Sequence, residues 1–440
     1  MKKSFYIETF GCQMNKGDSE LMGLSMIRNG FIPAPDMKSA EICIFNTCSV
    51  RQNAEDRAIA IIKETKKSRA KKNSLIILTG CMAQHIGDDM VTSGIADISI
   101  GPYQSPACGE IITEFLSNDK KKIYSSQKPD DFAPRIDNDL IPDQDTHSWH
   151  KWVTITHGCE NFCSYCIVPY VRGKLISFPS EKIIKFIDNL AKKGITEITL
   201  LGQNVNQYGQ DSGDIPFYRL LEKTAMISGL KRINFLTSHP MDFSPEIVDV
   251  IKNHPNISRG IHLPLQSGSD KILKEMNRKY TISHYYNIVD IITKELGEFA
   301  LSTDLITGFP DETDKDFKET LKAVKNIKFD EAFMFAYSPR TGTPAAEIAE
   351  PLSREEKLER LKQLITLQRK ISLEKLRLRI DKKETVIASK TSKKSNEELL
   401  GKTGLNHPVV FKGNVDDIGK EILVEIRGIK GSTLIGEKII

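Results

Sequence analysis

The sequence contains no long hydrophobic run. Nowhere in its 440 residues do apolar side chains continue for the ~18 positions that a membrane-spanning helix needs. Charge of one sign is also scarce, because 62 lysines and arginines nearly balance 58 acidic residues and leave a net charge of +4. With 39% hydrophobic and 27% charged residues, the composition excludes a mostly disordered chain and a polytopic membrane protein. The mild positive charge permits a polyanionic partner without arguing for one.

An export signal is lacking as well. Lys2 and Lys3 resemble the charged start of a signal peptide, but Glu8, Gly11 and Lys16 interrupt the apolar stretch that should follow. We therefore expect a cytoplasmic protein with no membrane partner. In that reducing compartment the eight cysteines should be free thiols or metal ligands rather than disulfides.

Residues 1–120 have the pattern of an α/β domain. The short apolar runs SFYIETF, EICIFNT and SLIILTG suit buried parallel strands, and helical stretches at 18–29 and 50–70 lie between them. Strands that alternate with helices predict a parallel sheet with helices on its faces. The polar segment 119–148 that follows has the composition of a linker.

Residues 145–372 repeat this alternation and form the second predicted domain. The expected strands are 152–156, 197–201, 232–236, 260–263, 299–306 and 332–337, with helices near 180–193, 215–228, 244–252, 281–296 and 313–327. Six βα units predict a partial (β/α)6 TIM-like barrel, since a complete barrel needs eight. Right-handed crossovers would bring all the strand carboxyl ends to one face.

The third predicted domain is a small β-barrel at 373–440. An amphipathic helix at 354–378 leads into it, and the short strands ETVIAS, EILVEIR and TLIGEKI follow, separated by Gly and Asn. Basic residues exceed acidic ones in this region. This excess suits a nucleic-acid-binding module and an ordinary solvated surface equally well.

Three cysteines are crowded into the segment HGCENFCSYC. Cys159, Cys163 and Cys166 have the spacing C-x3-C-x2-C and follow the first predicted barrel strand, on the face where active sites of such barrels lie. Three thiolates can hold three irons of a [4Fe–4S] cluster and leave the fourth iron open to another ligand. A tetrahedral zinc site that includes His157 is the alternative, which the lack of a second C-x2-C pair disfavours.

A second set of cysteines follows the three strands predicted in the N-terminal domain. Its members are Cys12, Cys48 and Cys81. The ends of parallel strands share one edge of the sheet, where ligands of open α/β sheets bind, although three unrelated buried thiols are the alternative. Gly11 and Gly80 precede two of these cysteines and permit tight turns or close approach to a bulky group. Cys43 and Cys108 lack this placement, and we interpret them as structural.

The crowded cysteine loop resembles the signature of the radical S-adenosylmethionine (SAM) superfamily. That signature is C-x3-C-x-aromatic-C, and Tyr165 supplies the aromatic residue. The resemblance implies that the open iron binds the amino and carboxylate groups of SAM. Reductive cleavage of SAM then gives a 5′-deoxyadenosyl radical, which removes hydrogen from unactivated C–H bonds as no side chain can.

Both cysteine sets, together with the C-terminal β module, resemble the radical SAM methylthiotransferase family over nearly the whole chain. The resemblance is carried by blocks such as ETFGCQMNKGDSE, FNTCSVRQNAEDR, LTGCMAQ, HGCENFCSYCIVPYVRG and STDLITGFPDET. The segment SKTSKKSNEELLGKTGLNHPVVFKG resembles a TRAM domain, which is an RNA-binding module. FGCQMN and NTCSVR are most similar to the branch that acts on N6-dimethylallyladenosine in tRNA. Other branches act on N6-threonylcarbamoyladenosine or on a ribosomal-protein aspartate.

The family resemblance implies that Cys12, Cys48 and Cys81 bind a second [4Fe–4S] cluster, whose open iron carries the sulfur to be donated. One SAM methylates this sulfur. A second SAM gives the radical that removes hydrogen from C2 of the adenine at position 37, next to the anticodon. The implied partners are the tRNA anticodon stem-loop, an electron donor such as a flavodoxin or ferredoxin, and an iron–sulfur carrier protein. We expect the chain to act as a monomer.

The superfamily resemblance also implies SAM contacts at the barrel strand ends. The cofactor-binding residues expected there are Tyr165, Gly202, Gln203, Gln266, Ser267, Asp304 and Gly308, beside Ile306. Loop-shaping roles are the alternative for the residues at the strand ends. Arg172 and Arg340 are candidates for contact with a substrate phosphate or the SAM carboxylate, because arginine forks suit both, but surface ion pairs are the favoured interpretation.

Two positions depart from the family pattern. Phe178 stands where the family has a second arginine, and Asp311 stands where glycine is usual.

Two basic stretches suggest RNA contacts. They are 63–72 and the pair at 393–394, and their charge would make tRNA binding sensitive to salt. For 63–72 a solvated helix face is the favoured interpretation.

Overall fold

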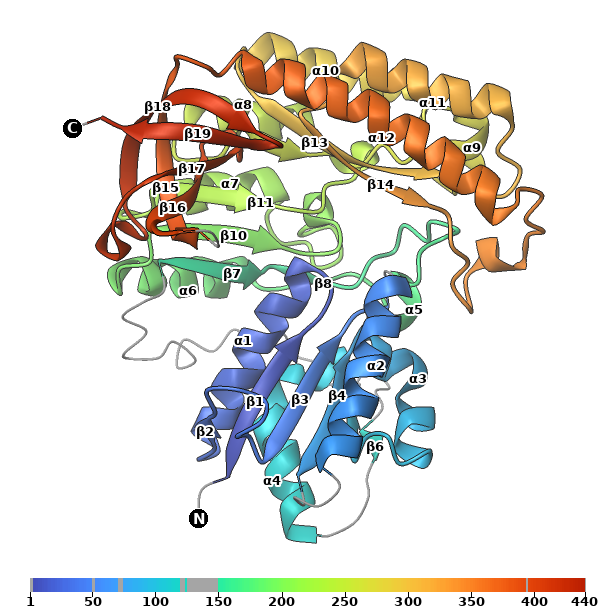
Figure 1. Ribbon diagram of the computed structural model, residues 1–440, viewed down its shortest axis with the longest axis vertical. Helices are drawn as coiled ribbons and strands as arrows, with labels where there is room; N and C mark the ends of the chain where they lie inside the picture. The colour runs from blue at the N-terminus through green and yellow to red at the C-terminus, as the bar shows by residue number, and fades with distance from the viewer. Residues whose placement is uncertain are drawn as a thin grey trace.

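The structure is a computed structural model that describes residues 3–49, 52–69, 74–118, 123–124, 149–392 and 395–439. It has two lobes (Figure 1): the N-terminal sheet domain forms the lower lobe, and the six-strand barrel with the C-terminal β-barrel forms the upper lobe. The predicted linker 119–148 lies outside the described residues, apart from strand β6 (Ile123–Tyr124).

The N-terminal domain is built on a six-stranded sheet with the order β2-β1-β3-β4-β5-β6, in which all neighbours are parallel. Its other strands are β1 (Ser4–Thr9), β2 (Ile32–Pro33), β3 (Ile42–Thr47), β4 (Leu75–Gly80) and β5 (Ile98–Ile100). The three predicted strands are confirmed as the neighbours β1, β3 and β4. Every residue of β3 is buried because helices cover both faces.

Helices α1 (Gln13–Arg28), α2 (Gln52–Arg69), α3 (Cys81–Thr92) and α4 (Cys108–Asn118) cover this sheet, with the 3-10 turn η1 (Pro102–Ala107) before α4. Ile44 packs with Met22 on one face and Phe45 with Met82 on the other, as the alternation of a strand requires. The helix predicted at 18–29 begins earlier, at Gln13, because the chain turns into the helix directly after the extended Cys12.

All six predicted barrel strands are confirmed. They are β7 (His150–Thr154), β10 (Glu197–Leu201), β11 (Arg232–Phe235), β12 (Gly260–His262), β13 (Ala300–Thr307) and β14 (Glu331–Ala336). They form two parallel three-stranded sheets, β11-β10-β7 and β12-β13-β14, which a parallel bridge from Ile233 to Ile257 brings together. The first strand differs in its bounds, because Ile155 separates β7 from the two-residue β8 (Thr156–His157), which pairs with β9 (Ile176–Ser177).

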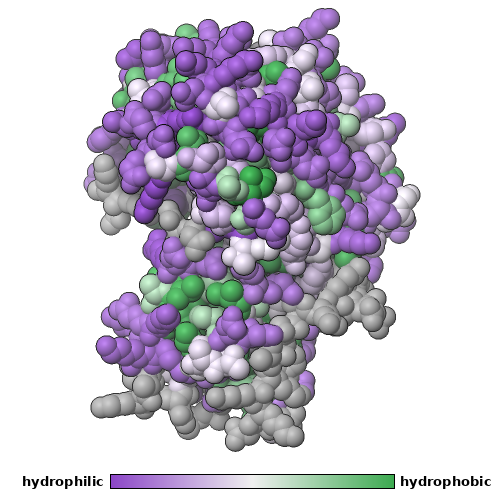
Figure 2. Space-filling view, turned by 90° about the vertical axis from the view of Figure 1, so that its right-hand side faces the viewer, coloured by the Kyte–Doolittle hydropathy of each residue, from purple (hydrophilic) through white to green (hydrophobic). Residues whose placement is uncertain are grey.

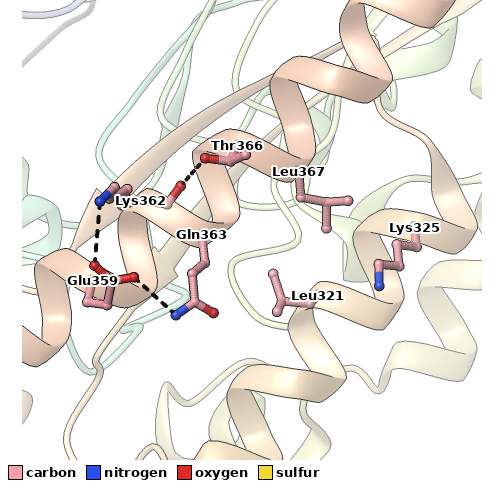
Figure 3. Close-up of a pocket in the computed structure, with 7 residues that line it drawn as sticks. All are labelled: Leu321, Lys325, Glu359, Lys362, Gln363, Thr366 and Leu367. Carbon is pink, nitrogen blue, oxygen red and sulfur yellow. Dashed lines mark hydrogen bonds and ion pairs between the residues drawn. The ribbon is translucent and has the colours of Figure 1, made fainter.

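The barrel helices lie outside these strands (Figure 1). They are α5 (Val168–Arg172), α6 (Ser180–Lys192), α7 (Phe217–Ala225), α8 (Pro245–Asn253), α9 (Asp270–Glu275), α10 (Ile282–Leu296), α11 (Asp314–Ile327) and α12 (Arg354–Arg377), with 3-10 turns η3 (Val205–Gln207), η4 (Pro240–Asp242) and η5 (Pro344–Glu347). A surface groove between α11 and α12 is lined by Leu321, Leu367 and polar side chains (Figure 3). None of the predicted site residues lines this groove.

The predicted C-terminal β-barrel is confirmed as a closed barrel with the order β15-β16-β17-β19-β18. Its elements are β15 (Lys383–Ser392), β16 (Ser395–Thr403), β17 (Pro408–Lys412), η6 (Val415–Asp417), β18 (Glu421–Lys430) and β19 (Thr433–Lys438). Helix α12 runs past residue 372, so the expected boundary at 372–373 falls inside it. The barrel contacts the central domain where the Arg259 amide donates to the Gly404 carbonyl (3.1 Å).

The face that Figure 2 shows is mostly hydrophilic, with hydrophobic side chains in small groups, the largest of them on the lower lobe. Across the described part of the chain, no helix combines the length and the apolar character that crossing a membrane requires.

Asp330, at the start of β14, joins three parts of the upper lobe. Its carboxylate accepts from the Leu301 amide of β13 (2.8 Å), pairs with Lys375 of α12, and lies 3.5 Å from Nε2 of His407 in the C-terminal barrel. Burial opposes ionisation of Asp330, but these three partners outweigh it and hold its pKa below the usual value. The ionised carboxylate therefore fastens the C-terminal barrel and α12 to the central domain.

We predict that Asp330→Asn destabilises the fold by about 3 kcal/mol, the typical result of removing one partner of a buried ion pair. Because the folded-state pKa is lowered, this stabilisation is present above the unfolded pKa of ~3.9 and is lost as the pH falls through the folded pKa. Denaturant unfolding at neutral and acid pH measures both effects. The control is Asp188→Asn, which removes an exposed pair with Lys192. Equal losses in the two variants would contradict the prediction.

Candidate functional site

The carboxyl ends of β1, β3 and β4 bring three cysteines to one edge of the sheet, which confirms the expected placement. Cys12 precedes α1, Cys48 follows β3, and Cys81 is the first residue of α3. The register aligns Thr47 of β3 with Gly80 of β4, so the two strands end at the same level. We call Cys12, Cys48 and Cys81 the N-terminal trio.

Two glycines let the backbone close around the N-terminal trio. Gly11 has a φ of +99°, and a Cβ atom there would lie 2.2 Å from the Cβ of Cys48. Gly80 has a φ of +87°, and its Cβ would lie 2.3 Å from the Thr47 carbonyl oxygen. No L side chain fits at either place, in keeping with the expectation that these glycines permit tight turns beside the cysteines.

The thiols of the N-terminal trio differ in acidity. A hydrogen bond with Cys48 lowers the pKa of Cys12 to about 6, against the opposing effect of burial, and the positive charge of Arg172 acts in the same direction. Burial raises the pKa of Cys81. Cys48 and Cys81 are almost fully buried, at 1% and 2% exposed. The trio therefore offers one cysteine with a pKa of about 6, Cys12, beside two cysteines that are shielded from water.

Arg172 of α5 reaches from the barrel into the N-terminal domain. Its Nε donates to Cys81 Sγ (3.2 Å), and its Nη2 donates to Asp18 Oδ2 (2.6 Å) and Asn15 Oδ1 (3.3 Å). The side chain is 2% exposed, and the Tyr103 hydroxyl donates to its carbonyl oxygen (2.7 Å). These protein groups engage Nε and Nη2, and the pair with Asp18 is buried, so the interpretation of Arg172 as part of a surface ion pair is wrong. Contact of Arg172 with a substrate phosphate or the SAM carboxylate stays a prediction.

Other barrel residues also lie against the N-terminal trio. Ile167, directly before α5, and Val171, within it, form a small buried apolar cluster with Cys81. Arg340 is partly buried: burial lowers its pKa, while the negative charges of Glu55 and Cys48 act in the opposite direction. The segment that follows the crowded cysteine loop is thus in direct contact with the first cysteine set.

The crowded cysteine loop follows β8, as predicted, and we call Cys159, Cys163 and Cys166 the barrel trio. The loop is fixed by its neighbours, since the Ser164 amide donates to the Met276 carbonyl (3.0 Å) and Asn277 Nδ2 donates to the Phe162 carbonyl (2.8 Å). Phe162 has a φ of +45°, in the left-handed region that favours glycine. The bond from Asn277 holds it in this strained conformation.

A second buried arginine contacts the barrel trio. Nη1 of Arg278 lies 3.6 Å from Cys163 Sγ, and its other nitrogens donate to Tyr280 and to the Pro264 carbonyl. Burial raises the pKa of the Cys159 thiol to about 11 and also raises that of Cys166. Because metal binding takes the deprotonated form, loading of this trio must release protons.

The donor chemistry of both trios fits [4Fe–4S] clusters. Each offers three mostly buried thiols and one buried guanidinium. Within the described ranges, no three His, Cys, Asp or Glu side chains are grouped as ligands of a single metal ion. An iron–sulfur cluster binds each thiolate to a different iron, so its ligands need not meet at one point.

Residues expected to contact SAM lie at the strand ends, and their surroundings differ. A Cβ atom at Gly202 would lie 2.1 Å from Thr156 Oγ1, so this glycine is sterically required. Both side-chain amide atoms of Gln203 are buried without a hydrogen-bond partner among the described residues. Tyr165 packs against the apolar cluster that contains Met276 and Phe309. Gln203 is thus the member of the set whose polar atoms are most in need of a ligand.

The remaining expected contacts are engaged with the protein. Gln266 has a φ of +70°, and its backbone bonds to Asp304 (2.8 Å) and Ile306 (2.9 Å) of β13. The Ser267 hydroxyl faces Thr320 at 3.3 Å. Gly308 (φ +67°) would bring a Cβ within 2.5 Å of a Lys357 side-chain carbon. These contacts define the shape of the barrel mouth.

The departures from the family pattern have physical explanations. Phe178 is buried in the barrel core, and its carbonyl accepts from the Tyr208 hydroxyl (2.6 Å). Asp311 has a φ of +64°, which explains why glycine is usual there. Cys43 and Cys108 are buried in the two cores of the N-terminal domain, in keeping with structural roles, and burial raises the pKa of Cys108 to about 12.

The basic stretches provide less evidence for RNA contacts than their charge suggested. Lys66 pairs with Asp97 (2.7 Å), while Lys63 and Lys67 face solvent on α2. Residues 70–72 and the pair at 393–394 lie outside the described residues.

Analysis of the sequence missed Asp18, Asn15 and Arg278 beside the cysteines. Asn15 and Asp18 lie in the block ETFGCQMNKGDSE and Arg278 lies in the segment EMNRKYT, but their spacing shows no direct sign of a role.

Two family models match the chain. Residues 153–324 match the model described as "Radical SAM superfamily", and residues 4–101 match "Uncharacterized protein family UPF0004". Among solved structures, the radical S-adenosylmethionine methyltransferase TsrM from Kitasatospora setae aligns with a TM-score of 0.57 at 12% identity, over 78% of this chain and 75% of that one. At this identity the likeness concerns the fold alone. The fold, the cysteine loop and the matching model define a radical SAM enzyme.

Curated relatives cover the chain from end to end. Proteins named tRNA-2-methylthio-N(6)-dimethylallyladenosine synthase are 39% identical in Dictyoglomus thermophilum, over 99% of this chain and 98% of the relative, and 40% identical in Clostridium botulinum (strain Okra / Type B1), over 99% and 97%. The relative from Thermoanaerobacter pseudethanolicus is 40% identical over 99% and 92%. The chain belongs to the family that these proteins form, the radical SAM methylthiotransferases, which confirms the expected resemblance.

We predict that Cys12 of the metal-free protein is alkylated with a half-maximal rate near pH 6, since its thiolate reacts and its pKa is about 6. Cys48→Ala removes the hydrogen bond that lowers this pKa and should move the profile toward the ordinary value of ~8.5. Mass spectrometry after timed iodoacetamide treatment measures it. Cys43→Ala, buried in a core, is the control. A profile unchanged by Cys48→Ala would refute the prediction.

Proposed function

We propose that this chain inserts a methylthio group at C2 of N6-dimethylallyladenosine at position 37 of tRNA, next to the anticodon. One SAM serves as methyl donor and a second as radical source. The observation that carries the proposal is the identity of about 40%, over almost the whole chain, with proteins named for this activity. The two cysteine trios support it, because C2–H is not acidic and the transferred sulfur needs a holder.

We further propose that each trio binds a [4Fe–4S] cluster with an open iron. Cys12, Cys48 and Cys81 would hold one cluster, and Cys159, Cys163 and Cys166 the other. With SAM, these groups would supply the radical and the sulfur, chemistry that no side chain provides. The chain's own residues hold the ligands in place and exclude water, since Cys48 and Cys81 are almost fully buried and Cys81 packs against Ile167 and Val171 of the barrel.

SAM contacts remain part of the proposal. Gln203 has the strongest support, because its buried amide atoms have no hydrogen-bond partner among the described residues. Tyr165, Gly202, Gln266, Ser267, Asp304 and Gly308 would shape and line the same mouth. Arg340 lies close to Cys48, so it is a candidate for contact with the substrate phosphate at the same site.

The partners follow from the chemistry. The closed β-barrel of β15–β19 supports an RNA-binding TRAM domain at 373–440, beside the sheet domain at 1–120 and the radical SAM core at 145–372. A base in a single-stranded anticodon loop leaves its stack easily, as buried chemistry on a base requires. We also propose a flavodoxin or ferredoxin as electron donor, an iron–sulfur carrier protein and the reducing cytoplasm as compartment.

Mass spectrometry of nucleosides tests the function. Anaerobically reconstituted protein, given SAM, reductant and tRNA from a strain that lacks this enzyme, should form the 2-methylthio derivative of N6-dimethylallyladenosine. Cys163→Ala should abolish both this product and 5′-deoxyadenosine. Cys81→Ala should abolish only the product, because SAM cleavage depends on the barrel trio. Cys43→Ala is the control that should keep both.

The other branches of the family give different outcomes in the same experiment. A methylthio group on N6-threonylcarbamoyladenosine, or on a ribosomal-protein aspartate, would replace the proposed substrate. Full product from the Cys81→Ala variant would contradict the assignment of sulfur donation to the N-terminal trio.

Gly11→Ala tests the cluster at the N-terminal trio. Its Cβ would collide with Cys48, so reconstituted iron should fall from about eight to about four atoms per chain. Gly30→Ala is the matched control, because Gly30 has a similar φ of +84° but open space around its Cβ. It should carry only the backbone strain of about 1–2 kcal/mol and keep about eight irons. Equal iron in both variants would count against the assignment.

A further inference from the structure

Each cysteine trio has one buried guanidinium beside one of its sulfurs. Arg172 Nε lies 3.2 Å from Cys81 Sγ, and Arg278 Nη1 lies 3.6 Å from Cys163 Sγ. The two arginines are 2% and 7% exposed. Because a guanidinium does not lose its proton in a protein, each trio has a permanent positive charge beside it.

The two arginines are anchored differently. Arg278 stays within the barrel, where it donates to the Pro264 carbonyl (2.8 Å) and to the Tyr280 hydroxyl (3.0 Å). Arg172 starts on barrel helix α5 and pairs with Asp18 of α1 in the N-terminal domain (2.6 Å). Arg172 therefore combines two roles that Arg278 does not: it crosses between domains, and its charge is partly offset by a carboxylate.

The crossing fixes the N-terminal trio mechanically. Asp18 and Asn15 lie on α1, which begins just after Cys12, and Cys81 begins α3. One planar side chain thus ties the starts of two helices to α5. Nη1 of Arg172 is buried without a hydrogen-bond partner among the described residues. The pair with Asp18 is therefore the main compensation for burying this charge, and separation of the domains would forfeit it.

The charge has a separate consequence. A [4Fe–4S]2+ core with three thiolates carries about one negative charge, and reduction adds another. A neighbouring guanidinium stabilises the more negative form, and a hydrogen bond to a ligand sulfur acts in the same direction. Loss of Arg172 should therefore make the group at the N-terminal trio harder to reduce, and loss of Arg278 should do the same at the barrel trio.

We propose that Arg172 is a positioning residue with two separable effects. Its fork locks the N-terminal trio onto the barrel, and its charge raises the reduction potential of the cluster at that trio. The second effect rests on the proposed function, since it requires a cluster there; the first does not. Transfer of sulfur from one bound group to another depends on the distance between them. The contacts by which Arg172 holds the N-terminal trio on the barrel therefore affect the rate of the reaction directly.

Three variants separate these effects. Arg172→Lys keeps the charge but loses the planar fork. Arg172→Met alone would leave the Asp18 carboxylate buried without its partner, which can prevent folding. The double variant Asp18→Asn with Arg172→Met therefore removes both members of the pair. Lys151→Met is the matched control: Lys151 of β7 pairs with Glu20 of α1 at 4.0 Å, across the same interface and on the same helix, and this pair involves no cysteine.

Hydrogen–deuterium exchange of the metal-free full-length chain measures the lock. The starts of α1 and α3 should exchange about tenfold faster or more in Arg172→Lys and in the double variant, a factor that corresponds to about 1.4 kcal/mol. Lys151→Met should leave both segments as in the wild type. If the double variant exchanges no faster than Lys151→Met, Arg172 does not lock the domains.

Redox titration of the reconstituted protein, followed by electron paramagnetic resonance, measures the charge effect. The double variant should lower the midpoint potential of one cluster, Arg172→Lys should keep it largely unchanged because the positive charge is retained, and Arg278→Met should lower the potential of the other cluster instead. Unchanged potentials in the double variant would overturn the charge effect. Neither measurement uses tRNA. A protein that methylthiolates another substrate would refute the proposed function while leaving the test of Arg172 intact.

Discussion

A buried charge that is satisfied across two domains determines how the parts of the site lie together. The Arg172 guanidinium is almost fully buried, and Asp18 and Cys81 of the other domain are the groups that compensate its loss of water. Burying a lone charge is far costlier than burying a paired one. The Tyr103 hydroxyl donates a hydrogen bond to the Arg172 carbonyl, and a Cβ atom at Gly173 would lie 2.2 Å from the Tyr103 hydroxyl oxygen. Arg172 of α5 and Gly173 at its end therefore require the two domains to lie close together.

The sequence predicted most of the fold because local pattern determines it. Apolar runs with a cysteine directly after them predicted β1, β3 and β4 and the edge at which their cysteines meet. The pairing of Arg172 with Asp18 spans 154 positions. No periodicity connects residues that far apart, and an arginine after a cysteine loop reads equally well as a ligand for phosphate. Burial excludes a surface ion pair at Arg172, and burial of single polar residues is not visible in a sequence.

Three residues that break local backbone rules lie in the crowded cysteine loop, in contact with it, or just after β12, while others such as Lys328 and Asp381 lie elsewhere. Phe162 (φ +45°), Gln266 (φ +70°) and Asn277 (φ +54°) all hold left-handed backbone conformations without being glycine. Each is retained by bonds from neighbouring elements, as when Gln266 exchanges two backbone bonds with β13. Strain of this kind persists only where the surroundings over-determine it, and it concentrates at functional sites. The glycines at 11, 80 and 202 answer the same need for close approach at lower energy.

The two cysteine trios are connected by a short piece of chain as well as by packing. Cys166 and Arg172 are joined through helix α5, whose five residues rise by only ~8 Å at ~1.5 Å each. Ile167 and Val171 of the same segment pack directly on Cys81. Any displacement of the N-terminal domain would therefore pull on the loop that carries the barrel trio. In the proposed function, a radical formed at the barrel trio must be used before it reacts elsewhere, so the N-terminal trio that would hold the sulfur has to stay within reach. The short connection through α5 and the packing of this segment on Cys81 meet that requirement.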